Sequence, residues 1–276
     1  MTNMIDLHVH SSASDGTLKP SEVVAYAHKK GLRAIALTDH DTVMGVEEAM
    51  NTELPIEVIP GIELSAGYGI GDIHILGLFV DHKSPKLLKI SEDVIKERDW
   101  RNEKMVDNLA ETGINITIDN LRELSGADGV ITRAHFARFL VDNNYVKDKA
   151  EAFKVYLAED TPYFVKRQYL TPEECISIIL ECNGYPVLAH PMLYKIPREE
   201  LNELIARLKN AGLYGIEAIY STYSEEEEAY VRELAEKYDL KITGGSDFHG
   251  SNKPDIDIGV GKGNLMIGYE LLEQFK

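Results

Sequence analysis

The sequence contains very little cysteine: Cys175 and Cys182 are the only two in 276 residues. They stand seven positions apart in a helical pattern, which places them on one helix face about two turns apart, too far for a disulfide bond. Because no CxxC pair exists, a thiolate zinc site is not expected. Two buried thiols in a reducing compartment are therefore predicted.

Long hydrophobic runs are also missing. No apolar segment approaches the ~18 residues of a membrane-spanning helix. Residues 1–10 lack the basic region and the apolar core of a secretory signal. We therefore expect no membrane partner and a cytoplasmic location. The sequence does not indicate an oligomeric state.

Basic residues are few compared with acidic ones, which gives a formal net charge of −17. Such a surface repels long nucleic acids and anionic membranes, so neither is an expected partner. A small phosphorylated substrate is compatible with this charge, because bound metal ions reverse the local field inside a pocket. The 44% of hydrophobic residues is ordinary for a globular protein and is enough to bury a full core.

Short apolar segments rich in β-branched residues alternate with longer amphipathic ones. This alternation predicts an α/β fold with parallel strands joined by right-handed crossovers. Seven strands suit a small or distorted (β/α) barrel, although an open doubly wound sheet has the same pattern. The predicted strands are Met4–Val9, Arg33–Leu37, Ile56–Pro60, Ile73–Val80, Pro186–Ala189, Gly215–Ile219 and Lys241–Gly244.

The alternation stops between residues 84 and 168, where the pattern is helical and no core strand is predicted. We expect residues 1–83 and 169–276 to form the barrel, and residues 84–168 to form a helical insertion that caps one end of it. The predicted helices of the insertion are Leu87–Glu111, Asp119–Leu124, Arg133–Val141 and Lys149–Leu157.

Histidines and carboxylates follow several of the predicted strands. His8 and His10 end the first strand, where side chains at i and i+2 point to one side and can converge on an ion or pair inside the barrel. His40 follows the second strand, at the end where barrels carry their catalytic side chains. Asp39 and Asp41 beside it can orient a ligand or cap a helix.

Three further motifs and one strand histidine continue the pattern. Glu63 stands between apolar residues after the third strand. If its carboxylate is buried, a cation is expected to offset the cost of burial, and the alternative is a side chain that faces solvent. His74 lies within an apolar strand, a position that also suits a core histidine. His190 follows the fifth strand, and Asp247 and His249 repeat the i, i+2 spacing after the seventh. Together these positions indicate a metal-binding cluster at one end of the barrel.

The motifs HVHSSASDG, LTDHDT, PGIE, HILG, AHP and GSDFHG resemble the PHP (polymerase and histidinol phosphatase) superfamily. They follow the expected order from His8 to His249, so the resemblance covers essentially the whole chain. It implies a distorted seven-stranded barrel. Within the superfamily the chain is most similar to stand-alone phosphoesterases that act on nucleoside 3′,5′-bisphosphates or short RNA ends. The shared features are Asp15, where many members have histidine, the TDHDT motif and the helical insertion.

The resemblance implies two or three divalent ions, and Mn²⁺, Zn²⁺ and Fe²⁺ all suit mixed imidazole and carboxylate ligands. Glu63 would bridge the first two ions. The implied sets are His8, His10, Glu63 and Asp247 for the first ion, Glu63, His74 and His190 for the second, and Asp15, His40 and His249 for the third.

The implied activity is hydrolysis of a phosphate ester of a small nucleotide, with a nucleoside 3′,5′-bisphosphate favoured, by metal-activated water. Glu63, Asp247 and His190 are the expected catalytic residues. Arg133 and His135 match an Arg-x-His that faces the substrate phosphate in the resembling enzymes, and a salt bridge is the alternative for Arg133.

Other candidate functions are a histidinol-phosphate phosphatase, a 5′→3′ exonuclease on short RNA and a non-catalytic metal-binding accessory module.

The proposed hydrolysis needs no serine or cysteine nucleophile, so the serines of the motifs are expected to donate hydrogen bonds around the ligands. These serines are Ser11, Ser65 and Ser246, and the further anion-binding candidates are Arg98, Arg101, Lys166 and Arg167.

Overall fold

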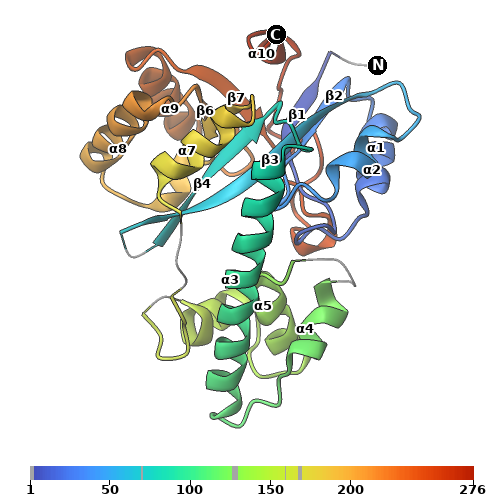
Figure 1. The fold of residues 1–276 in the computed structure, drawn as a ribbon, viewed down its shortest axis with the longest axis vertical. Coiled ribbons are helices and arrows are strands. Elements are labelled where there is room, and N and C mark those ends of the chain that lie inside the picture. The colour runs from blue at the N-terminus through green and yellow to red at the C-terminus, as the bar shows by residue number, and fades with distance from the viewer. Residues whose placement is uncertain (1–2, 70, 126–129, 159, 167–169) are drawn as a thin grey trace.

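The computed structural model describes residues 3–276 except 70, 126–129, 159 and 167–169. Seven strands form one sheet in chain order. A bridge between Val9 and Phe248 brings the first and last strands together, so the sheet is a nearly closed barrel (Figure 1). The predicted α/β seven-stranded barrel is confirmed. The strands are β1 Ile5–Val9, β2 Ala34–Leu37, β3 Glu57–Tyr68, β4 Gly71–Leu78, β5 Tyr185–Leu188, β6 Gly215–Tyr220 and β7 Lys241–Gly245.

The expectation of parallel strands throughout is wrong for β4, which pairs antiparallel with both β3 and β5. The predicted end of the third strand at Pro60 is also wrong, because β3 continues to Tyr68 along β4. Glu63 therefore lies within β3 and not after it. Because β4 runs in the opposite direction, its first half lies at the barrel end where the parallel strands finish, and this brings His74 to the same end.

Helices cover the outside of the barrel, α1 and α2 on one side and α7, α8 and α9 on the other (Figure 1). Local signals start and stop them. Thr171 and Ser224 accept hydrogen bonds from the first turns of α7 and α9, and Gly212, at a φ of 108°, ends α8. The bounds are α1 Pro20–Lys29, α2 Val46–Met50, α7 Pro172–Glu181, α8 Arg198–Ala211, α9 Glu225–Lys237 and α10 Glu270–Glu273, with 3₁₀ turns η2 Pro191–Tyr194 and η3 Gly250–Asn252.

The barrel interior is filled by apolar side chains from alternating strand positions, among them Ile59, Leu76 and Ile219. Apolar residues of the C-terminal segment, such as Ile267 and Phe275, join the same core. Glu63 and His74 stand an even number of positions from Ile59 and Leu76, so they share the inward-facing side of their strands. Both cysteines are buried, as predicted, and they do not form a disulfide bond with each other.

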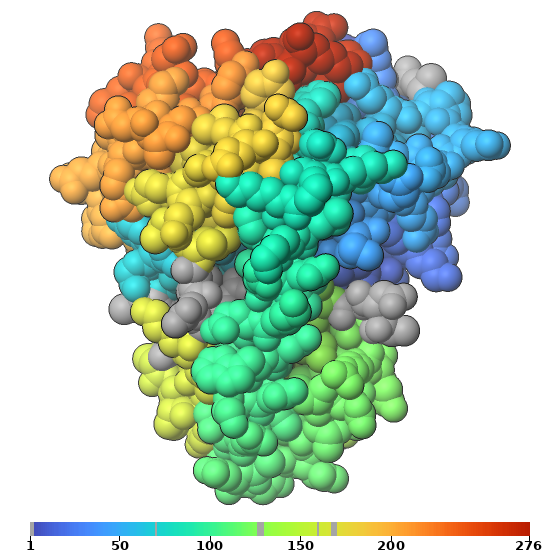
Figure 2. All heavy atoms as spheres, viewed as in Figure 1, coloured from blue at the N-terminus to red at the C-terminus, as the bar shows by residue number. Residues whose placement is uncertain are grey.

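The segment between β4 and α7 forms a helical lobe beside the barrel, and its described residues contain no strand. Figure 2 shows α3 crossing from the larger body onto this lobe. The lobe has its own apolar core, which includes Met105, Phe136 and Leu157. The division at residues 84 and 168 stays a prediction, and its second boundary lies outside the described residues. The bounds are α3 Pro85–Ala110, α4 Ile118–Ser125, α5 Arg133–Asp142, α6 Lys149–Ala152 and the π-helical turn η1 Phe153–Leu157.

No helix among the described residues has the length and apolar character that crossing a bilayer requires.

Candidate metal centre

The first group of polar side chains gathers at the end of β1. The Nε2 atoms of His8 and His10 lie 3.1 Å apart. Glu63 Oε2 lies 3.3 Å from the first nitrogen and 3.2 Å from the second. Asp247 Oδ1, from the segment after β7, lies 3.7 and 3.4 Å from the same two atoms. His8, His10 and Glu63 thus present one atom each to the same small volume, and Asp247, also predicted for this ion, approaches both histidines.

Glu63 presents its two oxygens to different neighbours. Oε2 faces the first group, whereas Oε1 lies 2.9 Å from His74 Nδ1 and 3.1 Å from His190 Nε2. This arrangement suits a carboxylate that would bridge two ions. His40 Nδ1 also lies 3.0 Å from Oε2, so His40 groups with Glu63 and His74 as well as with Asp15, a relation that the sequence did not indicate.

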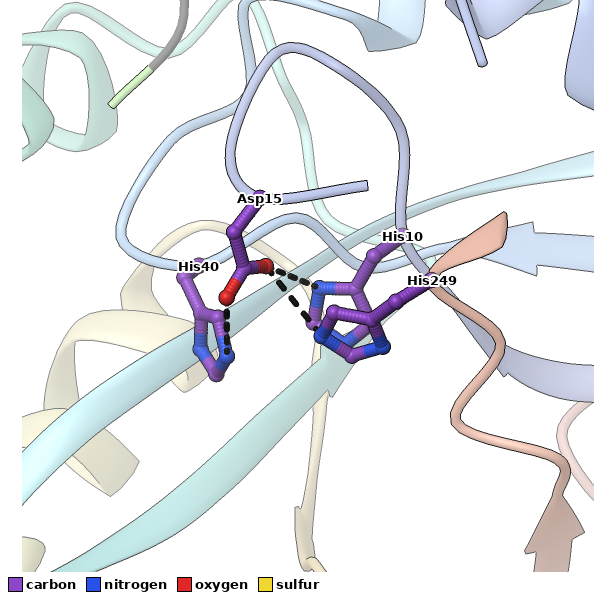
Figure 3. Close-up of side chains that lie close together, drawn as sticks. All are labelled: His10, Asp15, His40 and His249. Carbon is purple, nitrogen blue, oxygen red and sulfur yellow. Dashed lines mark ion pairs between the residues drawn. The ribbon is translucent and has the colours of Figure 1, made fainter. Parts of the chain in front are cut away.

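The third group surrounds Asp15, as Figure 3 shows. Asp15 Oδ1 lies 3.1 Å from His249 Nε2 and 3.9 Å from His10 Nδ1, and Oδ2 lies 4.0 Å from His40 Nε2. His10 was predicted for the first ion alone, but its two ring nitrogens face two groups. All nine residues predicted as metal ligands therefore lie in one continuous cluster.

The donor set of this cluster fits divalent ions. Ligands held tetrahedrally about 2.1 Å from one ion lie about 3.4 Å apart, and the distances within the first group are 3.1–3.7 Å. Four buried atoms of the cluster also have no hydrogen-bond partner within the described residues. A bound cation would either bind such an atom or rearrange the side chain that carries it. These atoms are His10 Nδ1, His40 Nδ1, Glu63 Oε2 and His190 Nδ1.

The charges of the cluster support the same conclusion. Burial alone would raise the pKa of Glu63, but His40, His74 and His8 lower it well below its usual value of 4.5. Burial would lower the pKa of His10, but Asp247 and Glu63 raise it to about 9. The carboxylates are therefore ionised and attract positive charge, which a metal ion supplies while displacing protons from the imidazoles.

Three residues of the site segments have left-handed backbone conformations: Asp41, His190 and Asp247, with φ values of 56°, 26° and 57°. Such conformations are unfavourable for residues other than glycine, and surrounding contacts must hold them. In each case the residue follows a strand within four positions, so the turn of the backbone helps direct the side chain at the end of the barrel.

The sequence analysis missed residues that hold the predicted ligands in place. Tyr220 and Lys253 both donate to Asp247 Oδ2 at 2.5 Å, while Oδ1 faces the histidines. Glu217, fully buried on β6, lies 3.1 Å from His8 Nδ1. The available signal for Glu217 was the same as for Glu63: a single acid in an apolar strand.

The side chains of the serines predicted as hydrogen-bond donors act on residues beside the ligands. They donate to three other buried carboxylates, in the pairs Ser11–Asp39, Ser65–Asp41 and Ser246–Asp6, at 2.6, 3.1 and 2.5 Å. Neither Asp39 nor Asp41 caps a helix. Asp39 holds the loop after His10, and Asp41 forms a buried ion pair with Arg98 of α3.

A cavity of about 200 Å³ lies between the cluster and the helical lobe. The barrel contributes ligands such as Asp15, His40 and His74 to its walls. The lobe contributes three arginines and one aromatic side chain: Arg98, Arg101, Arg133 and Phe153. Cationic side chains therefore face the metal-binding cluster across a space large enough for a small anion.

The two predicted substrate-binding residues of the lobe have different surroundings. Arg133 lines the cavity and lies 3.4 Å from Asp72, so the predicted salt bridge is also present. His135 is 1% exposed and its Nδ1 accepts a hydrogen bond from the Thr132 backbone N–H, which helps to cap α5. Burial lowers the pKa of His135 to about 4, so its ring is neutral at pH 7. Lys166 is exposed, and Arg167 lies outside the described residues.

Comparisons with known proteins agree with this site. The PHP domain model matches residues 6–159. The chain is 36% identical to a 5′-3′ exoribonuclease of Haemophilus influenzae, over 90% of this chain and 91% of the relative. It is 34% identical to a 3′,5′-nucleoside bisphosphate phosphatase of Chromobacterium violaceum, over 92% and 90%.

A solved structure of an amidohydrolase from Chromobacterium violaceum, with bound sulfate, superposes with a TM-score of 0.86. The two chains are 34% identical, and the match covers 92% of this chain and 89% of the other. The fold, the cluster and these likenesses agree, and the chain belongs to the PHP domain family as one of its phosphoesterases.

Proposed function

We propose that the protein hydrolyses a phosphate monoester or diester of a small nucleotide, with a nucleoside 3′,5′-bisphosphate as the favoured substrate. The observation that carries the proposal is the cavity in which arginines of the lobe face the histidine and carboxylate cluster of the barrel. Guanidinium groups bind phosphoryl oxygens through paired, charge-assisted hydrogen bonds. A phosphoryl group in this cavity would lie between the two sets of charges.

The dimensions and charge of the site favour a small substrate. A cavity of about 200 Å³ is smaller than the roughly 300–1,000 Å³ of pockets that enclose whole drug-sized ligands. It therefore suits the phosphate end of a nucleotide and leaves the base at the rim, where Phe153 is 37% exposed. Aromatic side chains stack on bases of any sequence. The net charge of −17 disfavours a long nucleic acid.

Each residue type in the site has a distinct task in the proposed reaction. Bound divalent ions, Mn²⁺, Zn²⁺ or Fe²⁺, supply an activated water and neutralise phosphoryl charge. Glu63, Asp247 and His190 would act in catalysis through the ions that they would hold. The arginines of the lobe orient the phosphate and balance its charge, and the lobe limits access of bulk water to the cavity.

The relatives leave a second candidate function, removal of nucleotides from the 5′ end of short RNA, since one of them is named an exoribonuclease. A nucleoside bisphosphate and an RNA 5′ end share a phosphate next to a ribose, so the same cavity serves both. Histidinol phosphate lacks a nucleobase to contact Phe153. A binding-only role is disfavoured because the implied ligand set is complete.

The direct test is phosphate release from adenosine 3′,5′-bisphosphate by the purified protein with added Mn²⁺. We expect rapid release that a chelator abolishes and that renewed Mn²⁺ restores. A 5′-phosphorylated RNA of a few nucleotides and histidinol phosphate serve as competing substrates. If metal-loaded protein releases phosphate from histidinol phosphate alone, the nucleotide proposal is wrong although the metal centre remains.

Replacing Arg133 by alanine is expected to reduce kcat/KM for the bisphosphate by about 10- to 100-fold, because a hydrogen bond to a charged group contributes about 1.5–3 kcal/mol. Arg138→Ala is the matched control. Arg138 lies on the same helix, α5, but pairs with Asp142 at a surface position 40% exposed. Equal kinetics for the two variants would show that Arg133 does not contribute to substrate binding.

A further inference from the structure

We propose that Glu217 on β6 is a positioning residue: it fixes the tautomer and the orientation of His8 and so prepares the first ion-binding group. Its carboxylate oxygens lie 3.1 and 3.3 Å from His8 Nδ1. Neither side chain is exposed to solvent. The two residues are 209 positions apart in the sequence, so this contact ties β6 to β1 across the barrel.

β6 carries no predicted ligand, but Glu217 lies on it beside ligands from other segments. β6 lies between β5 and β7, the strands that are followed by His190 and Asp247. Its register against β7 shifts between Glu217 and Ile219, an irregularity that is common beside active sites because it redirects a side chain. Glu217 points into the barrel toward His8 of β1 and toward His190, which follows β5.

An ionised carboxylate only accepts hydrogen bonds. A hydrogen bond between Glu217 and His8 therefore places the ring proton of a neutral His8 on Nδ1 and leaves the lone pair on Nε2. Nε2 is the atom that faces His10, Glu63 and Asp247. A carboxylate on the far nitrogen also makes the ligating nitrogen more basic, which strengthens metal binding.

Glu217 holds a second ligand residue at the same time. Its Oε2 accepts a hydrogen bond of 2.9 Å from the backbone N–H of His190. His190 has a left-handed backbone with a φ of 26°, which needs such support. One carboxylate thus positions His8 in the first group and His190 in the second.

The substitution Glu217→Gln tests this role without changing the side chain's shape. Glutamine replaces one carboxylate oxygen by an N–H₂ group, so it loses the negative charge and turns a donor toward one of the two groups that donate to Glu217, His8 Nδ1–H or His190 N–H. We expect Zn²⁺ to dissociate about 10- to 100-fold more readily from its tightest site, measured by competition with a chromogenic chelator. Thr243→Val is the control, since Thr243 pairs with Glu217 in the sheet and its buried hydroxyl makes no hydrogen bond within the described residues.

A second measurement uses the unaltered protein and so does not depend on how the variant folds. In the Zn²⁺-loaded protein, long-range ¹H–¹⁵N spectra of labelled histidine should show His8 protonated at Nδ1. An Nε2-protonated His8, or Zn²⁺ affinity in Glu217→Gln equal to that of Thr243→Val, would overturn the proposal. Both readouts report metal binding and not turnover, so they are independent of which phosphate ester is the substrate.

Discussion

The substitution Glu63→Gln should reduce phosphate release by more than about 100-fold, the upper range for residues that only orient a ligand. Its two carboxylate oxygens face different groups, Oε2 toward His8 and His10 and Oε1 toward His74 and His190. Glutamine would turn an N–H₂ group toward one of them, where a cation and its ligands require an acceptor. Loss of one Glu63 oxygen would therefore weaken binding of both ions that the proposal assigns to this carboxylate.

Steady-state turnover and metal content per chain should be measured together for Glu63→Gln. Glu57→Gln is the matched control, because Glu57 begins the same strand but pairs with Lys276 at its far end. We expect lower metal content and very low turnover for the first variant and unaltered values for the second. Near-normal turnover of Glu63→Gln would refute the bridging role.

The cluster could be predicted from the sequence because its members interrupt apolar segments. A histidine or acid at a strand end is unfavourable unless a cation or a hydrogen-bond partner offsets its burial. His190, for example, follows directly on such a segment, and His40 comes three positions after the end of another. The sequence does not give the distances between strands, and these distances decide which residues share an ion. Only the structure shows that His10 and His40 each belong to two groups.

The direction of β4 could not be obtained from hydrophobic periodicity, which is the same for parallel and antiparallel strands. A signal was present in the glycines between Gly67 and Gly71, because a connection this short permits only a hairpin. The early end assigned to the third strand at Pro60 obscured it. Glu217 was missed for a related reason, since its strand has no histidine beside it and its partner His8 is distant in sequence.

The contact between lobe and barrel gives the largest expected effect on stability. Arg98 of α3 pairs with Asp41, and these side chains are only 8% and 1% exposed. We expect Arg98→Met to lower the free energy of unfolding by about 3–5 kcal/mol, because removing one partner leaves a buried charge without its counterion. Urea unfolding followed by circular dichroism measures the change.

A double variant distinguishes a buried-charge penalty from lost packing. Adding Asp41→Asn to Arg98→Met removes the uncompensated charge, while the amide oxygen can still accept from the Ser65 backbone N–H as Asp41 does. We therefore expect the double variant to be more stable than Arg98→Met alone. Arg122→Met, at an ion pair 63% and 88% exposed on α4, should change stability by less than about 1 kcal/mol.

The same ion pair links the lobe to the metal centre. The Asp41 backbone N–H donates to the carbonyl oxygen of Glu63 at 2.9 Å, and Arg98 lines the cavity. Loss of the guanidinium therefore removes a cavity charge and loosens the segment beside Glu63. We expect kcat/KM of the double variant to stay low even where its stability recovers. Full recovery of both would mean that Arg98 contributes to folding alone.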